Sequence, residues 1–386
     1  MRSIFLALSC AWLAQAISIW DPTGPYHVGY TQHVFNHTTP NDPTEPGTFM
    51  LTTIYYPTLV VPNTTVPYMD PIAADIFEKT IGMTPGSLSR LTTRLQFQTS
   101  TLIGTDPAYG NGTSPYPTII FTPGAGVPAV AYTAYLSELA SHGYAVVAID
   151  HPGEAPYLAL PYGGGGVYGY PDFAAYPPTL AEAFQVYAFR LSDTAALMSD
   201  AFLPALVRSF AAPFNLSHFA VFGHSVGGAA AAGVMAANDS KARLFRAGAN
   251  LDGTLPQLAD ENFQPDPAKV PVDLKRPFVQ LASEAHTGDG TWEAFDRAQS
   301  GWLRDVAING TRHLDYSDIP LWIDLLEQRN VTNGTWVGPA DGVRVTQLVN
   351  AVLKGLFGSV GGESLGEVDE WLEKAPEFFP VYEHDP

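Results

Sequence analysis

Cysteine is almost absent from this sequence of 386 residues. The single one, Cys10, lies in a short apolar stretch at the start of the chain. The residues beyond it can form no disulfide with one another and supply neither a thiol nucleophile nor a thiolate metal site. We therefore expect the fold to depend on an apolar core, and with 46% hydrophobic residues the chain is long enough to bury one.

Positive charge is also scarce. The 19 Lys and Arg residues face 38 Asp and Glu residues, which gives a formal net charge of -19. Nucleic acids and anionic membranes would be repelled by such a protein, so we expect neither as a stable partner. Acidity by itself also keeps a secreted protein in solution.

Long apolar runs are missing too, and the apolar run nearest the start of the sequence is short. Arg2 is followed by the apolar run from Ile4 to Leu13 and by the small-residue pattern Ala14-Gln15-Ala16. This pattern predicts a secretory signal peptide over residues 1–16, too short to span a bilayer and cleaved after Ala16. Eight Asn-x-Ser/Thr sequons agree with export and predict glycans on some of Asn36, Asn63, Asn111, Asn215, Asn238, Asn309, Asn330 and Asn333.

No Gly/Ser-rich, Pro-rich or charged linker divides residues 17–386, so we expect a single domain with insertions near 58–115 and 157–178. Strands alternating with helices predict an α/β fold, a mostly parallel sheet with helices on both faces. The expected strands are 28–36, 49–56, 116–122, 144–150, 218–223, 247–252 and 277–282. The expected helices are 72–79, 130–141, 180–202, 226–237, 292–306, 320–327 and 345–356.

A Gly-x-Ser-x-Gly pattern, Gly223-His224-Ser225-Val226-Gly227, lies between an expected strand and an expected helix. The apolar strand Phe219–Phe222 precedes it and an alanine-rich helix follows. This is the setting of a nucleophile elbow, in which glycines let strand and helix approach around a strained serine. We interpret Ser225 as the nucleophile; the alternative is an ordinary glycine-rich junction. His224 would point away from the serine, and we expect it to pack in the interior.

A serine nucleophile needs a histidine base and a carboxylate that orients it, and in α/β folds of this kind both follow the serine in the chain. Three carboxylates compete for the acid: Asp252, Glu284 and Asp289. All three could lie at the carboxyl edge of the sheet. Asp252 is favoured because it ends a strand and is held on a turn by Gly253, whereas Asp289 lies in a run of Gly and Thr.

His286 and His313 are the two candidate bases in the folded part of the chain, and His384 is expected in a loose tail. His313 is favoured because it stands in a loop that leads into a helix, with Ser317 or Asp318 as its cap. For the oxyanion hole, the backbone N–H of Val226 follows from its position after the serine. We expect the second N–H from Ala125, in the glycine-flanked loop after the strand 116–122.

Several segments resemble the platelet-activating-factor acetylhydrolase family of the plasma type, within the α/β-hydrolases. They occur in order along the chain: Gly24 to Gly29, Phe121 to Gly126, Ser141 to Tyr144, Ala148 to His151, Gly223 to Gly228, Leu251-Asp252-Gly253, Ala282-Ser283-Glu284 and His313 to Asp318. The resemblance implies the triad Ser225, Asp252 and His313, with Ala125 and Val226 as oxyanion donors, and it selects Asp252 over Glu284. Thr122-Pro123 and the two insertions depart from the family.

The expected function is a secreted serine esterase that forms an acyl-enzyme and needs no metal or organic cofactor. The family suggests a small-molecule or lipid ester, with a short acyl chain at the second position of a glycerophospholipid and transient contact with lipid surfaces. A secreted carboxylesterase or cutinase-like polyesterase is the alternative, and a catalytically inactive binding protein is a third. The Gly/Tyr-rich segment 157–178 could be a lid or a disordered loop.

Overall fold

The computed structural model describes residues 16–386 except 45–47, 101–115, 333 and 335. The expected signal peptide with Cys10 therefore lies outside the described residues, apart from Ala16. So do the sequons Asn111 and Asn333 and the end of the first expected insertion.

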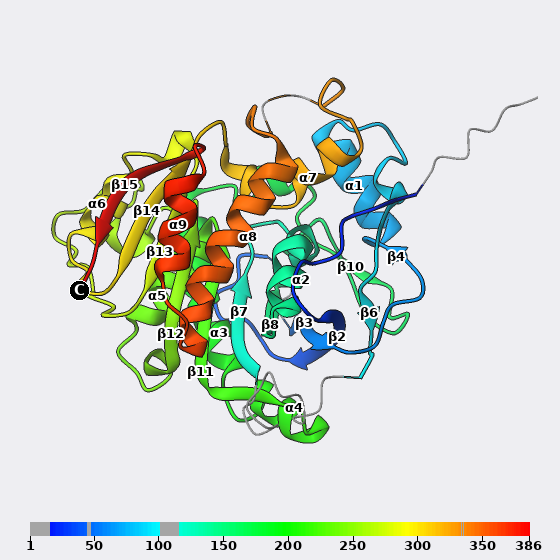
Figure 1. Cartoon of the computed structure of the whole chain (residues 1–386), viewed down its shortest axis with the longest axis horizontal. Coiled ribbons are helices and arrows are strands. Elements are labelled where there is room, and N and C mark those ends of the chain that lie inside the picture. Colours follow the sequence, from blue (N-terminus) through cyan, green and yellow to red (C-terminus); the bar gives the residue numbers. More distant parts are fainter. Residues whose placement is uncertain (1–15, 45–47, 101–115, 333, 335) are drawn as a thin grey trace, which may run out of the picture.

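A ten-stranded sheet runs through the molecule in the order β15-β14-β13-β12-β11-β7-β8-β3-β2-β6 (Figure 1). The strands from β14 to β8 are parallel to one another. β15 runs antiparallel to β14, β3 runs antiparallel to β8, and β2 runs antiparallel to β3. Their bounds are β2 His27–Asn36, β3 Phe49–Thr58, β6 Gln96–Phe97, β7 Tyr116–Thr122, β8 Ala145–Asp150, β11 Phe214–His224, β12 Phe245–Leu251, β13 Phe278–Ala282, β14 Leu303–Ile308 and β15 Phe378–His384.

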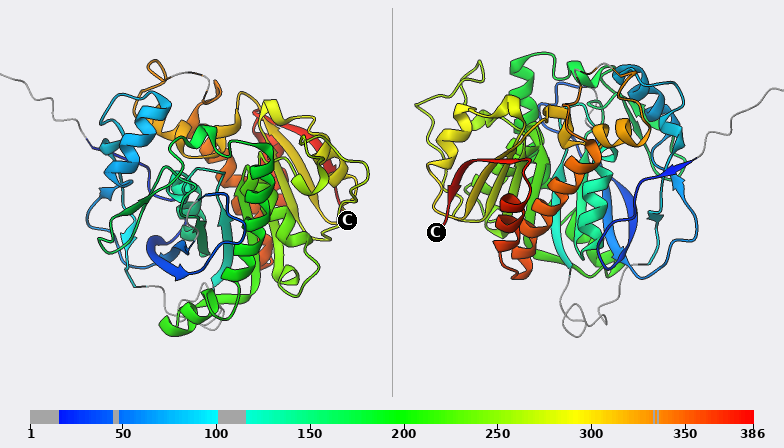
Figure 2. Two further views of the ribbon diagram at one scale, coloured as in Figure 1. Left: turned by 180° about the vertical axis from the view of Figure 1, so that it is seen from behind. Right: turned by 45° about the horizontal axis from the view of Figure 1, so that its top comes forward.

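Helices cover both faces of the sheet (Figures 1 and 2). One face carries α2 (Thr133–Ser141), α8 (Gly342–Gly358) and α9 (Gly366–Lys374), and the other carries α3 (Leu180–Leu197) and α5 (Val226–Ala236). Successive residues of β7 point to opposite faces, so that Phe121 joins the core beneath α8 and Ile120 joins the core beneath α5. The predicted α/β-hydrolase fold class is confirmed.

The insertions are ordered where the structure describes them. In the first, β4 (Val66–Pro67) and β5 (Leu91–Thr93) form a small sheet with β1 (Ile17–Ser18), and α1 (Pro71–Ile81) packs beside them. In the second, β9 (Tyr157–Ala159) and β10 (Gly166–Tyr168) form a hairpin. The segment 157–178 is therefore folded and is not a disordered loop.

The remaining helices are shorter. They are α4 Leu203–Phe210, α6 Gly290–Asp296, α7 Ile319–Leu325 and the 3₁₀ turns η1 Leu88–Arg90, η3 Ala129–Tyr132, η4 Phe173–Ala175, η5 Ala242–Leu244, η6 Pro256–Leu258, η7 Glu284–His286, η8 His313–Tyr316 and η9 Ser359–Gly361. Within the described ranges, no helix combines the length and apolar character needed to cross a bilayer.

Two expectations about the last third of the chain are wrong. The helix predicted over 292–306 is α6 followed by the buried strand β14. His384 does not lie in a loose tail, because it ends β15, which pairs with β14 along its length. Arg304 holds this end in place: its guanidinium donates to the carbonyl of His384 and to the carboxylate of Asp385.

Candidate active site

Ser225 lies on the sharp turn between β11 and α5, with φ 56° and ψ -128°. This region of backbone space is costly for a residue with a side chain, and such strain persists only where the surroundings impose it. Here the turn is fixed from both sides. The N–H of Ser225 donates to the carbonyl of Leu251 at 2.8 Å, and its carbonyl accepts from Ala229 at 3.0 Å.

The glycines of the motif are required by close backbone contacts. A Cβ at Gly223 or Gly227 would lie 2.4 Å or 2.0 Å from the carbonyl oxygen of Thr122, the last residue of β7. No side chain can be inserted at that distance without moving a strand. The elbow therefore sits directly on the end of β7, which brings the loop that contains Ala125 beside the serine.

Asp252 and His313 form the hydrogen-bonded pair that the sequence predicts. His313 Nδ1 donates to Asp252 Oδ2 at 2.7 Å, and Asp252 is also bound by the Ser283 N–H at 2.5 Å and the Ser283 hydroxyl at 3.1 Å. Burial by itself raises the pKa of Asp252, but the hydrogen bond from His313 and the nearby imidazole charges outweigh it, so the pKa is lowered. Asp252 is thus an anion that fixes the proton of His313 on Nδ1.

All five predicted site residues line one cleft of about 670 Å³: Ser225, Asp252, His313, Ala125 and Val226. Val226 is the first residue of α5, where the backbone N–H has no acceptor within the helix. The side chains of Ala125 and Val226 pack against the same small apolar cluster around Phe189. The two residues therefore border the same part of the cleft, as two backbone donors to one oxyanion would have to.

His224 is fully buried and connects two parts of the site. Its Nε2 donates to the carbonyl of His313 at 2.9 Å, and its Nδ1 accepts from the Tyr132 hydroxyl at 2.8 Å. Burial, helped by the positive charge of His313, lowers the pKa of His224 to about 3, so the ring is neutral. His224 therefore anchors the backbone of the candidate base, a contact that the sequence does not reveal.

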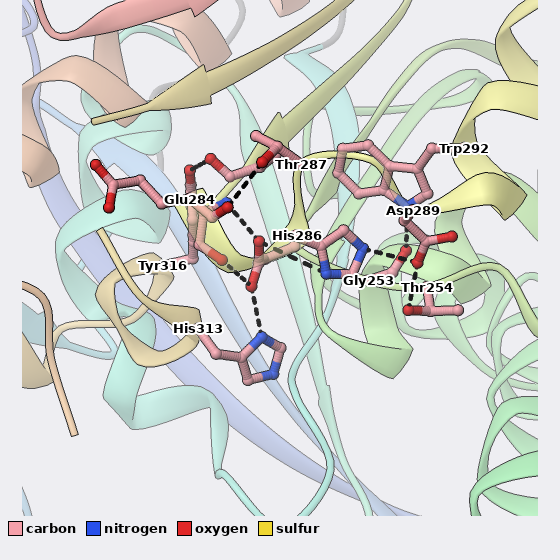
Figure 3. A network of polar contacts seen from close by, with 12 residues as sticks. Gly253, Thr254, Glu284, His286, Thr287, Asp289, Trp292, His313 and Tyr316 are labelled. Atoms are coloured by element: carbon pink, nitrogen blue, oxygen red, sulfur yellow. Dashed lines mark hydrogen bonds and ion pairs between the residues drawn. The ribbon is translucent and has the colours of Figure 1, made fainter. Parts of the chain in front are cut away.

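The rival carboxylates lie elsewhere. Glu284 accepts a hydrogen bond from the backbone N–H of Gly310 at 2.8 Å, and Asp289 caps α6 through the N–H of Thr291 at 2.7 Å. His286, the rival base, lies on the far side of Asp252 from His313, between Asp252 and Asp289 (Figure 3). Sequence reasoning considered His286 only as a base and missed this position.

Comparison with known proteins shows similarity to one family over part of the chain. The model of the family described as platelet-activating factor acetylhydrolase, isoform II, matches residues 13–159. A protein of Arthroderma benhamiae named "Probable 1-alkyl-2-acetylglycerophosphocholine esterase" is 26% identical over 215 residues, which cover 54% of this chain and 50% of that protein. The family model covers less than half of this chain, so the comparisons show that the chain is similar to proteins of the platelet-activating-factor acetylhydrolase family. The chain spans about half the length of the curated relative that it matches.

The match to the acetylhydrolase family model includes Ala125 and ends before the other four predicted site residues. The fold has a wider likeness. A ferulic acid esterase from Streptomyces cinnamoneus superposes with a TM-score of 0.71 over 96% of this chain and 100% of that one, at 20% identity. At this identity the likeness shows the α/β-hydrolase fold alone. The roles of the site residues therefore rest on the geometry of this chain itself.

Proposed function

We propose that this protein is a serine carboxylic ester hydrolase that acts through an acyl-enzyme. The observation that carries the proposal is the 2.7 Å contact between His313 and Asp252 in the cleft that also holds the strained Ser225. A serine on an elbow, with an imidazole oriented by a buried carboxylate, is the arrangement that activates a hydroxyl for attack on an acyl carbon.

The reaction runs in two halves. His313 Nε2 takes the hydroxyl proton of Ser225 while the oxygen attacks the ester carbonyl, and the N–H groups of Ala125 and Val226 bind the resulting oxyanion. The tetrahedral intermediate collapses, the alcohol leaves with the proton from His313, and the acyl group stays on Ser225. Water, deprotonated by His313, then attacks the acyl-enzyme and releases the carboxylic acid. Asp252 stabilises the imidazolium in both halves.

We propose that the substrate is a glycerophospholipid that carries a short acyl chain. This is the type of ester in the name of the Arthroderma benhamiae relative. Two features of the cleft support it. Apolar side chains such as Phe173, Leu314 and Trp336 supply much of the lining, which suits a lipid ester. Arg312 is the one Lys or Arg among the described residues that line the cleft, and it lies next to His313, where a phosphate near the scissile ester would meet it.

A substrate panel beside Ser225→Ala tests this function. The wild-type protein should hydrolyse short-chain phospholipid esters faster than triglyceride, cutin-like or aryl esters, and Ser225→Ala should lose at least about 10⁴-fold in kcat. Equal or better turnover of the other esters contradicts the phospholipid substrate. Activity retained by a folded Ser225→Ala, or failure of a serine-directed phosphonate to label the wild type, contradicts the serine hydrolase.

We also propose that the protein is exported after cleavage behind Ala16 and carries glycans on some of its sequons. The support is the signal-like pattern of residues 1–16 and the number of sequons. Expression in a eukaryotic secretion host tests it. The medium should contain a chain that begins at Ile17 and loses mass with an N-glycosidase, and retention of the full-length chain inside the cell contradicts the proposal.

A further inference from the structure

A second imidazole flanks the carboxylate of the triad. His286 Nδ1 lies 3.9 Å from Asp252 Oδ1, while His313 binds the other oxygen of the same carboxylate, Oδ2. On its far side, His286 Nε2 lies 3.2 Å from Asp289 Oδ2. Figure 3 shows His286 beside Asp289, with dashed lines that join His286 and His313 to one carboxylate, which is that of Asp252. The proposed mechanism assigns no role to His286.

His286 is held in this place by more than charge. Its ring packs on Trp292, with the ring centroids 4.7 Å apart, and Trp292 Nε1 donates to the carbonyl of Gly253 at 2.8 Å. Asp289 is fixed in turn, because its Oδ2 accepts from the Thr254 hydroxyl at 2.7 Å and its Oδ1 caps α6. Gly253 and Thr254 directly follow Asp252. The same short turn therefore carries the triad acid and the groups that hold Trp292 and Asp289 against His286.

We propose that His286 is a positioning residue of the triad, an imidazolium clamped between Asp252 and Asp289 that holds the Asp252 carboxylate in place and offsets part of its charge toward His313. This inference rests on the proposed hydrolase function. It assigns a role to a residue that does not touch the reacting atoms.

The electrostatic surroundings support a charged His286. Burial by itself lowers the pKa of His286, but the Asp289 carboxylate beside it and the charge of Asp252 outweigh burial, so the pKa is raised. Asp305 on β14 adds a smaller effect in the same direction. The other histidine near this row, His224 on β11, is neutral and does not compete for the carboxylates.

A charged His286 has a definite effect on the base. It neutralises part of the attraction by which Asp252 stabilises a protonated His313, and so favours the neutral imidazole that accepts the Ser225 proton. Loss of the His286 charge should move the acid limb of the kcat/KM profile to higher pH.

Two substitutions at His286 and one at its partner test this. His286→Gln removes the charge, and His286→Phe removes it but keeps a ring on Trp292. Asp289→Asn leaves His286 without its second anion, yet asparagine caps α6 as well as aspartate. In all three, the acid limb of kcat/KM should move up by about half a pH unit or more, kcat should fall several-fold, and KM should change less than twofold. His218→Gln, an exposed histidine on β11, is the control.

The same shift should appear without turnover. In the resting protein, the pH midpoint of the His313 ring signal in NMR should rise by a similar amount in each folded variant and stay fixed in His218→Gln. An unchanged midpoint and acid limb in folded His286→Gln and His286→Phe overturn the role of His286. The NMR midpoint is measured without substrate, so an unchanged midpoint contradicts the role of His286 alone. Failure of the hydrolase proposal would instead be seen as inactivity of the wild-type protein on the ester panel.

Discussion

Ser225 and Asp252 both have left-handed backbone, with φ values of 56° and 57°. The two turns contact each other, since a Cβ at Gly253 would lie 2.0 Å from the carbonyl oxygen of Ser225. The sequence favours Asp252 because a glycine follows it, and the structure gives the steric reason for that glycine. No pattern in the sequence predicts the contacts of His224 or the approach of His286 to Asp252, because these partners lie on elements distant in the chain.

At the residue scale, Asp252→Asn should remove the orientation of the base. An amide favours the wrong tautomer of His313, and we expect kcat to fall about 10³- to 10⁴-fold with the fold retained. Glu284→Gln is the matched control, because its amide oxygen can still accept from Gly310 and it should lose less than threefold. Steady-state kinetics with circular dichroism measure both. A loss below tenfold in folded Asp252→Asn contradicts its role as the triad acid.

Arg312→Gln should separate charged from neutral substrates. The guanidinium donates to the carbonyl of Gly334 at 2.6 Å, which holds it at the cleft while other N–H groups remain for a ligand. We expect KM for a phospholipid ester to rise about tenfold, and KM for a neutral ester of the same acyl chain to change less than twofold. Equal changes for both substrates would show that Arg312 does not bind the phosphate.

At the scale of elements, the central strands were predictable because a parallel strand buried on both faces reads as a continuous apolar run. β14 escaped prediction because it carries two charged residues in a buried strand: Arg304 pairs with the distant Asp369, and burial raises the pKa of Asp305 to about 7. Its neighbour α6 has Trp292 and Phe295 at helical spacing, which extended the expected helix across the strand. β15 was missed because Pro380 interrupts its apolar run, and a proline within such a run argues against a strand except at the edge of a sheet.

The contact between the elbow and β7 gives a prediction about elements. Gly227→Ala should force the end of β7 away from α5, and we expect a loss of about 3 kcal/mol or more in the free energy of unfolding. Urea denaturation measures it. Gly361→Ala is the control, because nothing lies within 4 Å of a Cβ there, and it should be nearly neutral. Similar stabilities for the two variants would contradict the steric account of the motif.

At the scale of the molecule, several carboxyls are buried in a protein that already carries a large negative charge. Burial, as the largest cause, raises the pKa of Asp150 and Asp315 to about 6 and that of Asp318 to about 7. Asp296 and Asp305 are also raised, first by burial and, for Asp296, then by the negative charge of Asp305. The folded state therefore binds protons that the unfolded chain has already released.

Stability should consequently fall as the pH rises from 6.5 to 8. A carboxyl with a raised folded pKa stabilises the fold below its unfolded value, near 4, and loses that contribution as the pH passes through the folded value. His286, also raised, acts in the same direction above 6.5. Three histidines have a lowered pKa: His33, His151 and His224. They make the stability rise with pH, but only below their ordinary pKa of 6.5.

Asp296→Asn should flatten this dependence, because it removes one of the two facing carboxyls and keeps an oxygen that accepts from Gln280. The free energy of unfolding, measured in urea at pH 6.5 and pH 8, should drop for the wild type by up to about 1.4 kcal/mol per pH unit for each proton released. The drop should be smaller in the variant. A wild-type protein that gains stability over this interval contradicts the assignment.

β15 is an edge strand of the sheet and pairs with β14 alone, and this matters for anyone who produces the protein. Trimming the chain after Ala375, or losing its end to a carboxypeptidase, would strip β15 from β14 and leave a row of unpaired backbone groups at the border of the sheet. Such a border recruits strands from other molecules. A shortened version would therefore aggregate during purification even though every residue of the cleft is intact, and affinity tags at this end need a spacer beyond Pro386.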